Sequence, residues 1–189
     1  MNTPDKKFYY LRHHRTQAHE EERICGGGSD LPLNQSAVED LKANAHLINE
    51  KLAEVKVIYT TPLLRARQTA ELINGQAHKD IQILAQLAEW HLGSWERQPW
   101  SDLPHPFTFE GTPPDGESRQ AFRERVNQAI DDLLERDEVF AIVGHGIFFH
   151  ELSAHLLTQA QYIETAELIS MSLHEGKWTF SRIPYKDKP

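Results

Sequence analysis

Near the start of the chain, an arginine and two histidines directly follow a short apolar run. Residues 8–16 read FYYLRHHRT, which places Arg12 and His13 at the end of this run. Such a run is typical of a buried strand, and open α/β sheets bind ligands at the carboxyl ends of their strands. A guanidinium matches the oxygens of a phosphate group, and a neutral imidazole can attack phosphorus. We therefore predict that His13 is a nucleophile beside a phosphate-binding Arg12, although a solvated surface pair would give the same local pattern.

Three later segments each place a polar side chain just beyond an apolar run. The first is a strand that enters a helix, the second is rich in large apolar residues, and the third is a strand that ends in a histidine between two glycines. They are VKVIYTTPLLRARQTA at 55–70 with Arg65, LAEWHLGSWE at 87–96 with Glu89, and VFAIVGHGI at 139–147 with His145. We expect these side chains to gather around the same site as His13.

Together these segments resemble the histidine phosphatase superfamily, also called the phosphoglycerate-mutase-like family. That family has, in this order, an Arg-His-Gly triplet, a Pro-Leu-x-Arg-Ala-x-x-Thr-Ala segment, a Leu-x-Glu-x-x-x-Gly-x-Trp-Glu segment and a Gly-His-Gly triplet. The resemblance extends from about Phe8 to beyond His150, and it includes DLPLN at 30–34 and PDGES at 114–118. The positions that match the functional residues of the family are Arg12, His13, Arg65, Glu89 and His145.

Cleavage of a phosphate ester needs groups that these positions supply. Arg65 would clamp the phosphoryl oxygens together with Arg12, and His145 would stabilise their charge as it shifts. Glu89, if lodged among the large apolar residues around it, would have a raised pKa, donate a proton to the leaving alkoxide and later accept one from water. This scheme requires no metal ion or other cofactor. Each residue also has a structural alternative: Arg65 as a solvated helix arginine, His145 as a loop histidine and Glu89 as a surface carboxylate. Glu96 is a weaker candidate than Glu89 for the general acid.

The residue after the predicted nucleophile departs from the family pattern, because His14 stands where most members have glycine. A glycine leaves room beside the phosphate and adopts strained backbone angles without cost. An imidazole that points inward would donate to the phosphate or block the site, whereas one that points outward would change little. We place His14 among the candidate substrate-binding residues, together with Arg15 and Thr16. The rest of this segment, from His19 to Glu22, is interpreted as a mobile charged loop.

Apolar stripes predict two clear helices. One spans Ser36–Ala53, where Ser36 and Glu39 have the spacing of a capping box, and the other spans about Ser118–Glu135. In the second helix, Glu117 and Ser118 of PDGES act either as a helix cap or as a substrate contact.

Strand and helix patterns alternate along the chain, which ends in a predicted hairpin around Glu175 and Gly176. Alternation of this kind implies βαβ units. We therefore predict one α/β domain over residues 1–189, a three-layer α/β/α sandwich with a mainly parallel sheet and an antiparallel edge strand. The longest irregular segment, 98–115, is the expected lid over the site. Its aromatic residues Trp100, Phe107 and Phe109 either contact an apolar part of the substrate or pack on the core.

The composition narrows the class of protein. The chain has 189 residues, of which 39% are hydrophobic, and a formal net charge of −8 at pH 7. This suits one sizeable core and argues against nucleic-acid binding, which needs a clustered basic surface. The lone Cys25 cannot form an intramolecular disulfide, and MNTPDKKF lacks the apolar core of a secretory signal, so we expect a cytoplasmic protein. No stretch approaches the ~20 apolar residues of a membrane span, so we expect no membrane partner. The partner implied by the resemblance is a small phosphate ester.

Other enzyme classes can be compared with the residues directly. A cysteine phosphatase needs Cys-x5-Arg, but Leu31 stands six residues beyond Cys25. The P-loop pattern G-x4-G-K-[ST] does not occur. A metal hydrolase that uses His13, His14 and His19 with the nearby acidic run is a minor alternative.

Within the resembled family, two features favour a compact phosphatase over a phosphoglycerate mutase. They are the short interval between Glu89 and His145 and the PDGES motif. The resemblance implies hydrolysis through a phosphohistidine, in a branch that includes phosphatases acting on α-ribazole 5′-phosphate. A further alternative is a phosphate-binding protein without catalytic activity, in which His14 has blocked the reaction.

Overall fold

The computed structural model describes residues 5–75 and 77–186, and a six-stranded sheet runs through it. The strands are β1 (Lys6–Arg12), β2 (Val57–Thr60), β3 (Asp80–Ile83), β4 (Phe140–Gly144), β5 (Leu168–His174) and β6 (Lys177–Arg182). The helices are α1 (Gln17–Glu20), α2 (Gln35–Lys51), α3 (Leu64–Asn74), α4 (Arg119–Leu134) and α5 (Gly146–Leu157). Three short 3-10 helices, η1 (Ala85–Leu87), η2 (Gly93–Trp95) and η3 (Trp100–Asp102), lie between β3 and α4.

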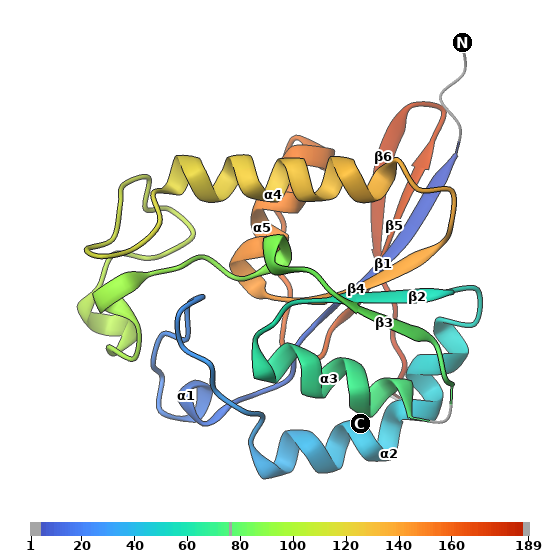
Figure 1. The fold of residues 1–189 in the computed structure, drawn as a ribbon, viewed down its shortest axis with the longest axis horizontal. Helices are drawn as coiled ribbons and strands as arrows, with labels where there is room; N and C mark the ends of the chain where they lie inside the picture. Colours follow the sequence, from blue (N-terminus) through green and yellow to red (C-terminus); the bar gives the residue numbers. More distant parts are fainter. Residues whose placement is uncertain (1–4, 76, 187–189) are drawn as a thin grey trace.

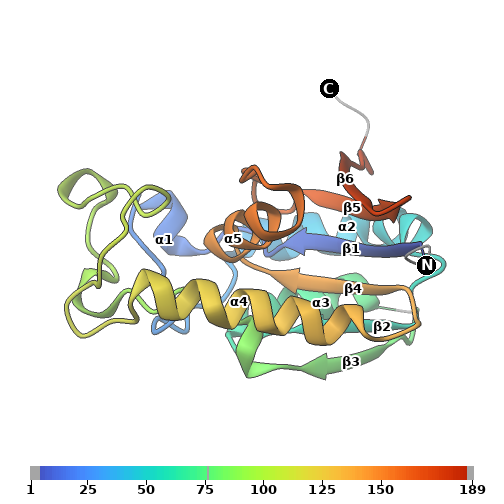
Figure 2. The same cartoon turned by 90° about the horizontal axis from the view of Figure 1, so that it is seen from above.

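The strands lie in the order β3-β2-β4-β1-β5-β6, as Figure 2 shows. The first four are parallel, and β5 and β6 are antiparallel. The predicted α/β fold is confirmed, with two antiparallel strands at one side instead of a single edge strand. The predicted hairpin is also present, because Glu175 and Gly176 have φ values of 50° and 76°, as a tight turn with two left-handed residues requires.

Successive side chains of a strand enter separate hydrophobic clusters on the two faces of the sheet. Phe8 and Tyr10 of β1 pack in the cluster of α4 and α5, whereas Tyr9 and Leu11 pack in the cluster of α2 and α3. Figure 1 shows these two helix layers on opposite sides of the sheet. Every residue of β2 and β4 is buried, as expected for parallel strands covered on both faces. In the described part of the chain, no helix combines the length and apolarity needed to cross a membrane.

The two predicted helices are α2 and α4. The sequence included the amino-terminal cap of α4 among its alternatives but did not identify that of α2. α4 begins after Ser118, whose Oγ accepts the N–H of Ala121 at 3.1 Å, which corresponds to the helix-cap alternative. The predicted capping box at Ser36 is wrong. Asn34 caps α2 instead, because its Oδ1 accepts the N–H of Ala37 at 2.8 Å and also the hydroxyl of Ser36.

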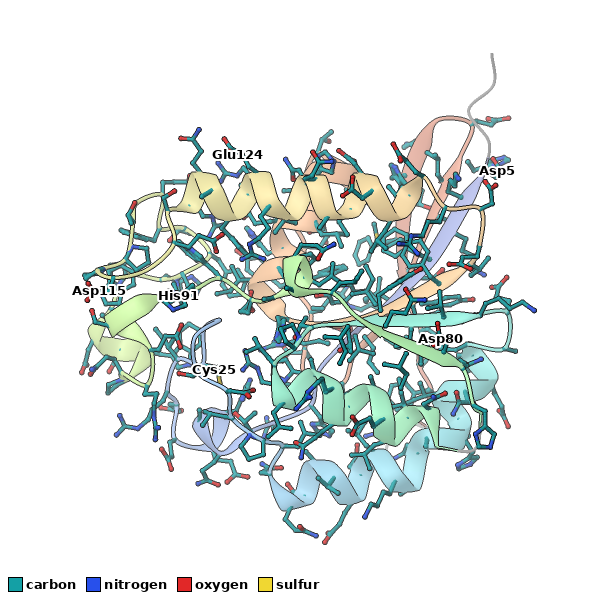
Figure 3. All side chains as sticks on the ribbon, in the orientation of Figure 1. Asp5, Cys25, Asp80, His91, Asp115 and Glu124 are labelled. Carbon is teal, nitrogen blue, oxygen red and sulfur yellow. The ribbon has the colours of Figure 1, made fainter. Side chains whose placement is uncertain are left out.

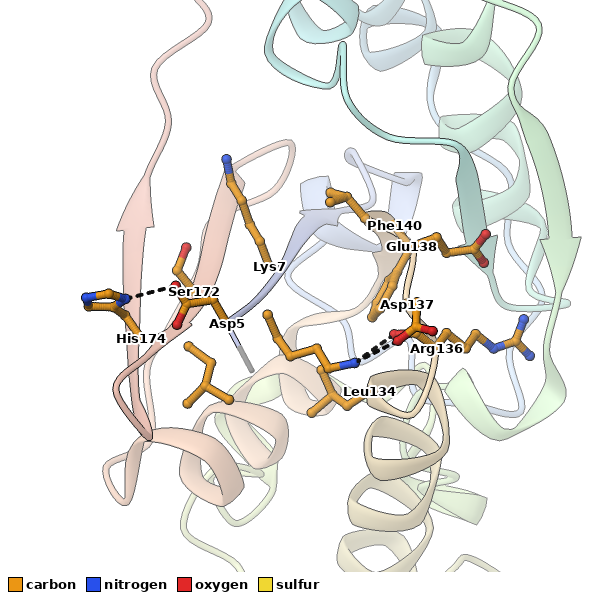
Figure 4. A pocket seen from close by; sticks show the side chains of 12 residues that line it. Asp5, Lys7, Leu134, Arg136, Asp137, Glu138, Phe140, Ser172 and His174 are labelled. Atoms are coloured by element: carbon orange, nitrogen blue, oxygen red, sulfur yellow. Dashed lines mark hydrogen bonds and ion pairs between the residues drawn. The ribbon is translucent and has the colours of Figure 1, made fainter. Parts of the chain in front are cut away.

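The carboxyl ends of the parallel strands share one edge of the sheet. In Figure 3, Cys25, His91 and Asp115 lie beyond this edge, whereas Asp5 and Asp80 lie at the opposite edge. The opposite edge holds a cavity of about 330 Å³ (Figure 4). Four of its charged or titratable groups form two pairs within the lining: Lys6 pairs with Asp137 at 3.7 Å, and Asp5 with His174 at 3.0 Å.

Candidate active site

His13 follows β1 and lies buried at the carboxyl edge of the sheet. Its Nδ1–H donates to the carbonyl oxygen of His14 at 2.6 Å, and Arg65 Nε donates to its Nε2 at 3.2 Å. A carbonyl only accepts and a guanidinium only donates, so these contacts fix the proton on Nδ1. Burial, followed by the charge of Arg65, lowers the pKa of His13 well below its usual range. At neutral pH, Nε2 is therefore unprotonated and keeps its electron pair, as a nucleophile must.

Arg65 lies in the first turn of α3 and is completely buried, which excludes the solvated helix arginine. Its two Nη groups donate to the carbonyl oxygens of Ser29 at 2.8 Å and Gly26 at 2.7 Å. The guanidinium therefore joins the loop before α2 to the nucleophile. Its Nε–H, now on His13, is the donor that can turn to a phosphoryl oxygen.

Arg12 approaches the same place from the end of β1. Its Nη1 donates to the carbonyl oxygen of Ile163 at 2.8 Å, while its Nε is buried and has no partner among the described residues. Its Nη2 lies 3.5 Å from His19 Nε2. The N–H of Thr16 donates to His19 Nδ1 at 3.3 Å, so Nε2 carries the ring proton. Two donors thus face one another, an arrangement that an anion accepting from both would satisfy.

His19 is a site residue that the sequence analysis missed, because we interpreted it as part of a mobile loop. Thr16 caps the short helix α1 and its hydroxyl contacts His19 Nδ1 at 2.9 Å, so the ring is held in place. Burial, followed by the charge of Arg12, lowers the pKa of His19 to about 4. The three-residue spacing from Thr16 to His19, typical of a capping pair, is the signal that could have indicated an ordered turn.

His145 is the residue before α5, and its backbone is fixed by Tyr10. The Tyr10 hydroxyl accepts the N–H of His145 at 2.7 Å and donates to its carbonyl oxygen at 2.9 Å. The Thr61 hydroxyl accepts the N–H of Leu63 and lies 3.0 Å from His145 Nε2. In the tautomer whose Nε2 accepts the Thr61 hydroxyl, the ring proton is on Nδ1, which is buried without a partner in the described structure. Burial, with the charges of Arg65 and Arg12, lowers the pKa of His145 well below its usual range.

The two glycines beside His145 are required by close packing. A Cβ atom on Gly144 would lie 2.2 Å from the Tyr10 hydroxyl oxygen. On Gly146 it would lie 3.1 Å from the guanidinium carbon of Arg12. The Gly-His-Gly pattern therefore lets the anchor of His145 and the phosphate-binding arginine approach the backbone.

Glu89 reaches the amino terminus of α5 from the segment after β3. Its Oε2 accepts the N–H of Ile147 at 3.0 Å, and its Oε1 accepts those of Phe148 at 2.9 Å and Trp90 at 3.1 Å. Burial raises the pKa of Glu89 above its ordinary value, and the three backbone donors partly oppose this shift. The surface carboxylate is excluded, since 7% of the residue is exposed. The buried carboxyl group can therefore exchange a proton at the mouth of the site.

These groups surround a cavity of about 130 Å³. The ring centroid of His13 lies 5.1 Å from that of His145 and 5.5 Å from that of His19. Arg12, His19 and Glu89 line the cavity with His13, while Arg65 and His145 support it from completely buried positions. Two guanidinium groups and the imidazoles of His19 and His145 thus surround a single small volume beside the unprotonated Nε2 of His13, an arrangement that suits a phosphate group.

Three predicted substrate-binding residues do not line this cavity. His14 turns toward α2, where its Nε2 lies 3.1 Å from Asp40 Oδ2, which corresponds to the outward alternative. Arg15 is exposed, and its carbonyl oxygen accepts the N–H of Asn34. Thr16 is buried and positions His19 instead of facing the cavity. The structure therefore does not bring these three side chains to the cavity with His13, because His14 has a partner on α2, Arg15 faces solvent and Thr16 holds His19.

Two further acidic residues have structural roles. Glu96 Oε1 accepts the N–H groups of Gly28 at 2.7 Å and Leu92 at 3.0 Å, so it fastens the glycine loop instead of competing with Glu89. Glu117 of PDGES pairs with Arg125 at 2.7 Å at the start of α4. The helix-cap interpretation of PDGES fits these contacts.

The expected lid segment contributes aromatic residues to the cavity and to the core. Trp100 and Phe107 line the cavity, whereas Phe109 packs on Trp95 with ring centroids 4.7 Å apart. Across the ranges 5–75 and 77–186, no three His, Cys, Asp or Glu side chains are grouped so as to hold a metal ion. Of the histidines considered for a metal site, His13 and His19 line the cavity, whereas His14 faces α2.

Comparison with known proteins agrees with this geometry. The family model of the histidine phosphatase superfamily (branch 1) matches residues 8–185. The chain belongs to that superfamily. Among its relatives, a protein of Citrobacter koseri named probable phosphoglycerate mutase GpmB is 32% identical over 155 residues, covering 75% of this chain and 70% of the relative. A protein of the same name from Enterobacter sp. (strain 638) is 29% identical over 195 residues, covering 97% of this chain and 86% of the relative.

Solved structures of superfamily members show the same fold. The α-ribazole phosphatase from Shigella flexneri has a TM-score of 0.80 and 21% identity, with 94% of this chain and 96% of that chain covered. A mycobacterial glucosyl-3-phosphoglycerate phosphatase solved with VO3 has a TM-score of 0.79 and 22% identity, with 94% and 98% covered. At these identities the likeness establishes the fold, and the substrates named for these proteins remain theirs.

Proposed function

We propose that this superfamily member is a phosphomonoester hydrolase that acts through a phosphohistidine on a small phosphorylated metabolite. The observation that carries the proposal is a set of incompletely bonded polar groups around the His13 ring. Among the described residues, Arg12 Nε and His145 Nδ1 have no partner, and Arg12 and His19 turn donors toward one another. The rings of His19 and His145 both lie near that of His13, whose unprotonated Nε2 accepts from Arg65. A tetrahedral phosphoryl group would accept from these donors while its phosphorus faces the nucleophile.

The reaction would proceed in two displacements. His13 Nε2 forms a bond to phosphorus as the bond from phosphorus to the ester oxygen breaks, and Glu89 gives its proton to that oxygen. A water molecule then attacks phosphorus, Glu89 takes a proton from it, and the bond to Nε2 breaks to release inorganic phosphate. Arg12, Arg65 and His145 stabilise the phosphoryl oxygens in both steps, and the His14 carbonyl holds the His13 ring in place.

Two more specific assignments extend this proposal. We favour hydrolysis over the mutase reaction named for the GpmB relatives, because of the PDGES motif and the compact segment between Glu89 and His145. An ester similar to α-ribazole 5′-phosphate is one candidate substrate, supported by the Shigella flexneri structural neighbour.

The decisive experiment measures phosphate release from p-nitrophenyl phosphate by the wild type and by His13→Ala. We expect turnover by the wild type, loss in the variant and no effect of EDTA. Transfer of phosphate between the hydroxyl groups of phosphoglycerate without net hydrolysis would favour a mutase. Binding of inorganic phosphate without any turnover would favour a noncatalytic protein. If His14→Gly then restored turnover, His14 would be the cause of the lost activity. Inhibition by EDTA would support the metal scheme.

A further inference from the structure

The mouth of the active-site cavity carries exposed aromatic side chains. In the described part of the chain, the exposed large hydrophobic residues are Ile83, Trp100 and Tyr162. Ile83 ends the edge strand β3, but the other two belong to the mouth. Trp100 is 38% exposed and lines the cavity, and Tyr162 is 53% exposed and packs edge-on against Phe107, another lining residue, with ring centroids 4.8 Å apart. Exposed apolar surface that is gathered at a cavity indicates a ligand-binding surface.

Phe107 is held in place on one side of this mouth. Its ring lies 5.1 Å from that of His150, whose Nδ1 is 3.2 Å from Glu151 Oε1. The carbonyl oxygen of the preceding residue, Pro106, accepts Arg119 Nη1 at 2.7 Å. The backbone and the ring are thus both fixed before a ligand arrives, which reduces the entropy lost on binding.

The charged groups at the mouth are already engaged. Arg23 is the lining cation apart from Arg12 and the histidines. Its Nε pairs with Glu21 at 3.3 Å, and its Nη1 donates to the carbonyl oxygen of Arg97 at 2.8 Å. The other walls are apolar, with Ile24, Leu92 and Ile147 facing the cavity. Beyond the phosphate position, the mouth therefore offers aromatic and aliphatic surface, and its cation Arg23 is already bonded and less suited to bind a second anion.

We propose that the leaving group carries a planar aromatic or heteroaromatic ring, which lies between Trp100 and Phe107 while the phosphoryl group faces His13. This inference rests on the proposed function and makes the two rings specificity-determining residues. Offset or edge-to-face contacts between aromatic rings strengthen binding by about two- to tenfold each. Two contacts together should favour an aromatic ester by about tenfold or more in kcat/KM.

The test compares two esters whose leaving alkoxides have similar basicity, 3-phenylpropyl phosphate and propyl phosphate. We expect the wild type to prefer the phenyl ester by about tenfold or more in kcat/KM, and Trp100→Ala and Phe107→Leu each to lower this ratio by about two- to tenfold. Ile83→Ala, which removes an exposed apolar side chain away from the cavity, should keep the wild-type ratio. Thermal unfolding of each variant checks that it is folded, and the exposed Trp100 makes that variant the safer one.

The outcomes separate the two proposals. Equal hydrolysis of both esters by the wild type, or an unchanged preference in the two variants, overturns the aromatic mouth and leaves the hydrolase intact. If the wild type hydrolyses neither ester, the hydrolase proposal fails, and calorimetry then decides the inference. Binding of 3-phenylpropyl phosphate about tenfold more tightly than propyl phosphate supports the aromatic mouth, and equal binding overturns it.

Discussion

Replacing Glu89 with glutamine separates the chemical role of this residue from its structural one. The carboxylate accepts backbone N–H groups through both oxygens, with Ile147 on Oε2 and Phe148 and Trp90 on Oε1. The single oxygen of glutamine can keep the two bonds made by Oε1, but its amide nitrogen then faces the N–H of Ile147. Each buried donor left without a partner costs about 1–3 kcal/mol, and here the N–H of Ile147 and the amide N–H of glutamine both lack an acceptor. Relief of the desolvation of an ionised group offsets part of the resulting loss in unfolding free energy.

The effect on catalysis should be larger and should depend on the leaving group. Glutamine cannot give up a proton, so an alkyl phosphate should lose ~10² to 10⁴ in kcat/KM. p-Nitrophenolate departs without protonation, so p-nitrophenyl phosphate should lose much less in this parameter, which reports steps up to phosphoryl transfer. In the wild type, the alkyl reaction should also slow as pH rises through the raised pKa of Glu89, because the acid form disappears. The variant should lack that pH dependence.

The assay is steady-state kinetics with propyl and p-nitrophenyl phosphates over a range of pH, together with urea unfolding. Glu96→Gln is the matched control, because Glu96 uses only Oε1 to accept its two backbone N–H groups and glutamine can keep both bonds. We expect the control to retain wild-type kinetics and stability. An equal loss for both esters in Glu89→Gln, or an unchanged pH profile, would refute the assignment of Glu89 as the general acid.

Three other predictions concern neighbouring residues. His14→Gly should leave kcat/KM nearly unchanged and lower the unfolding free energy by at most about 1 kcal/mol, because its partner Asp40 is a partly exposed ion-pair group; a large rise in phosphatase activity would contradict the outward placement. Tyr10→Phe should cost about 1–3 kcal/mol in urea unfolding and reduce kcat by up to ~10²-fold, because it frees the backbone of His145; wild-type values in both assays would refute this anchor. Glu151, whose pKa falls to about 2 from 4.5, should contribute about 3 kcal/mol of stability above pH 4.5 that is lost as pH falls toward 2, and unfolding of Glu151→Gln should lack this decline.

The positions of the main site residues could be predicted because they depend on simple rules of the fold. Parallel strands bring their carboxyl ends to one edge, so polar residues that follow β1 and β4 must lie close together. Arg12 and His13 lie after the first of these strands, and His145 after the second. Arg65 could be recognised from its motif, although its burial and its bonds to the glycine loop depend on contacts that spacing does not reveal.

The errors arose where distant or competing contacts determine a side chain. His14 faces away because Asp40, 26 residues later on α2, offers it a partner. His19 is ordered because Thr16 caps a helix of only four residues, too short to produce an apolar stripe. At α2, the backbone placed Asn34 at the cap in preference to Ser36, which lies two residues later. In each case the residue types were informative, but the choice among partners was made by the tertiary structure.

The most direct test of the account is to trap the phosphorylated enzyme. The wild type would be mixed with p-nitrophenyl phosphate, quenched within the first turnover under alkaline conditions, digested and analysed by mass spectrometry. We predict an acid-labile phosphate on His13, formed at least as fast as turnover, absent from His13→Ala and present in Glu89→Gln. Phosphate on another residue, or a phosphohistidine that forms more slowly than the product, would contradict the assignment of His13 as the nucleophile.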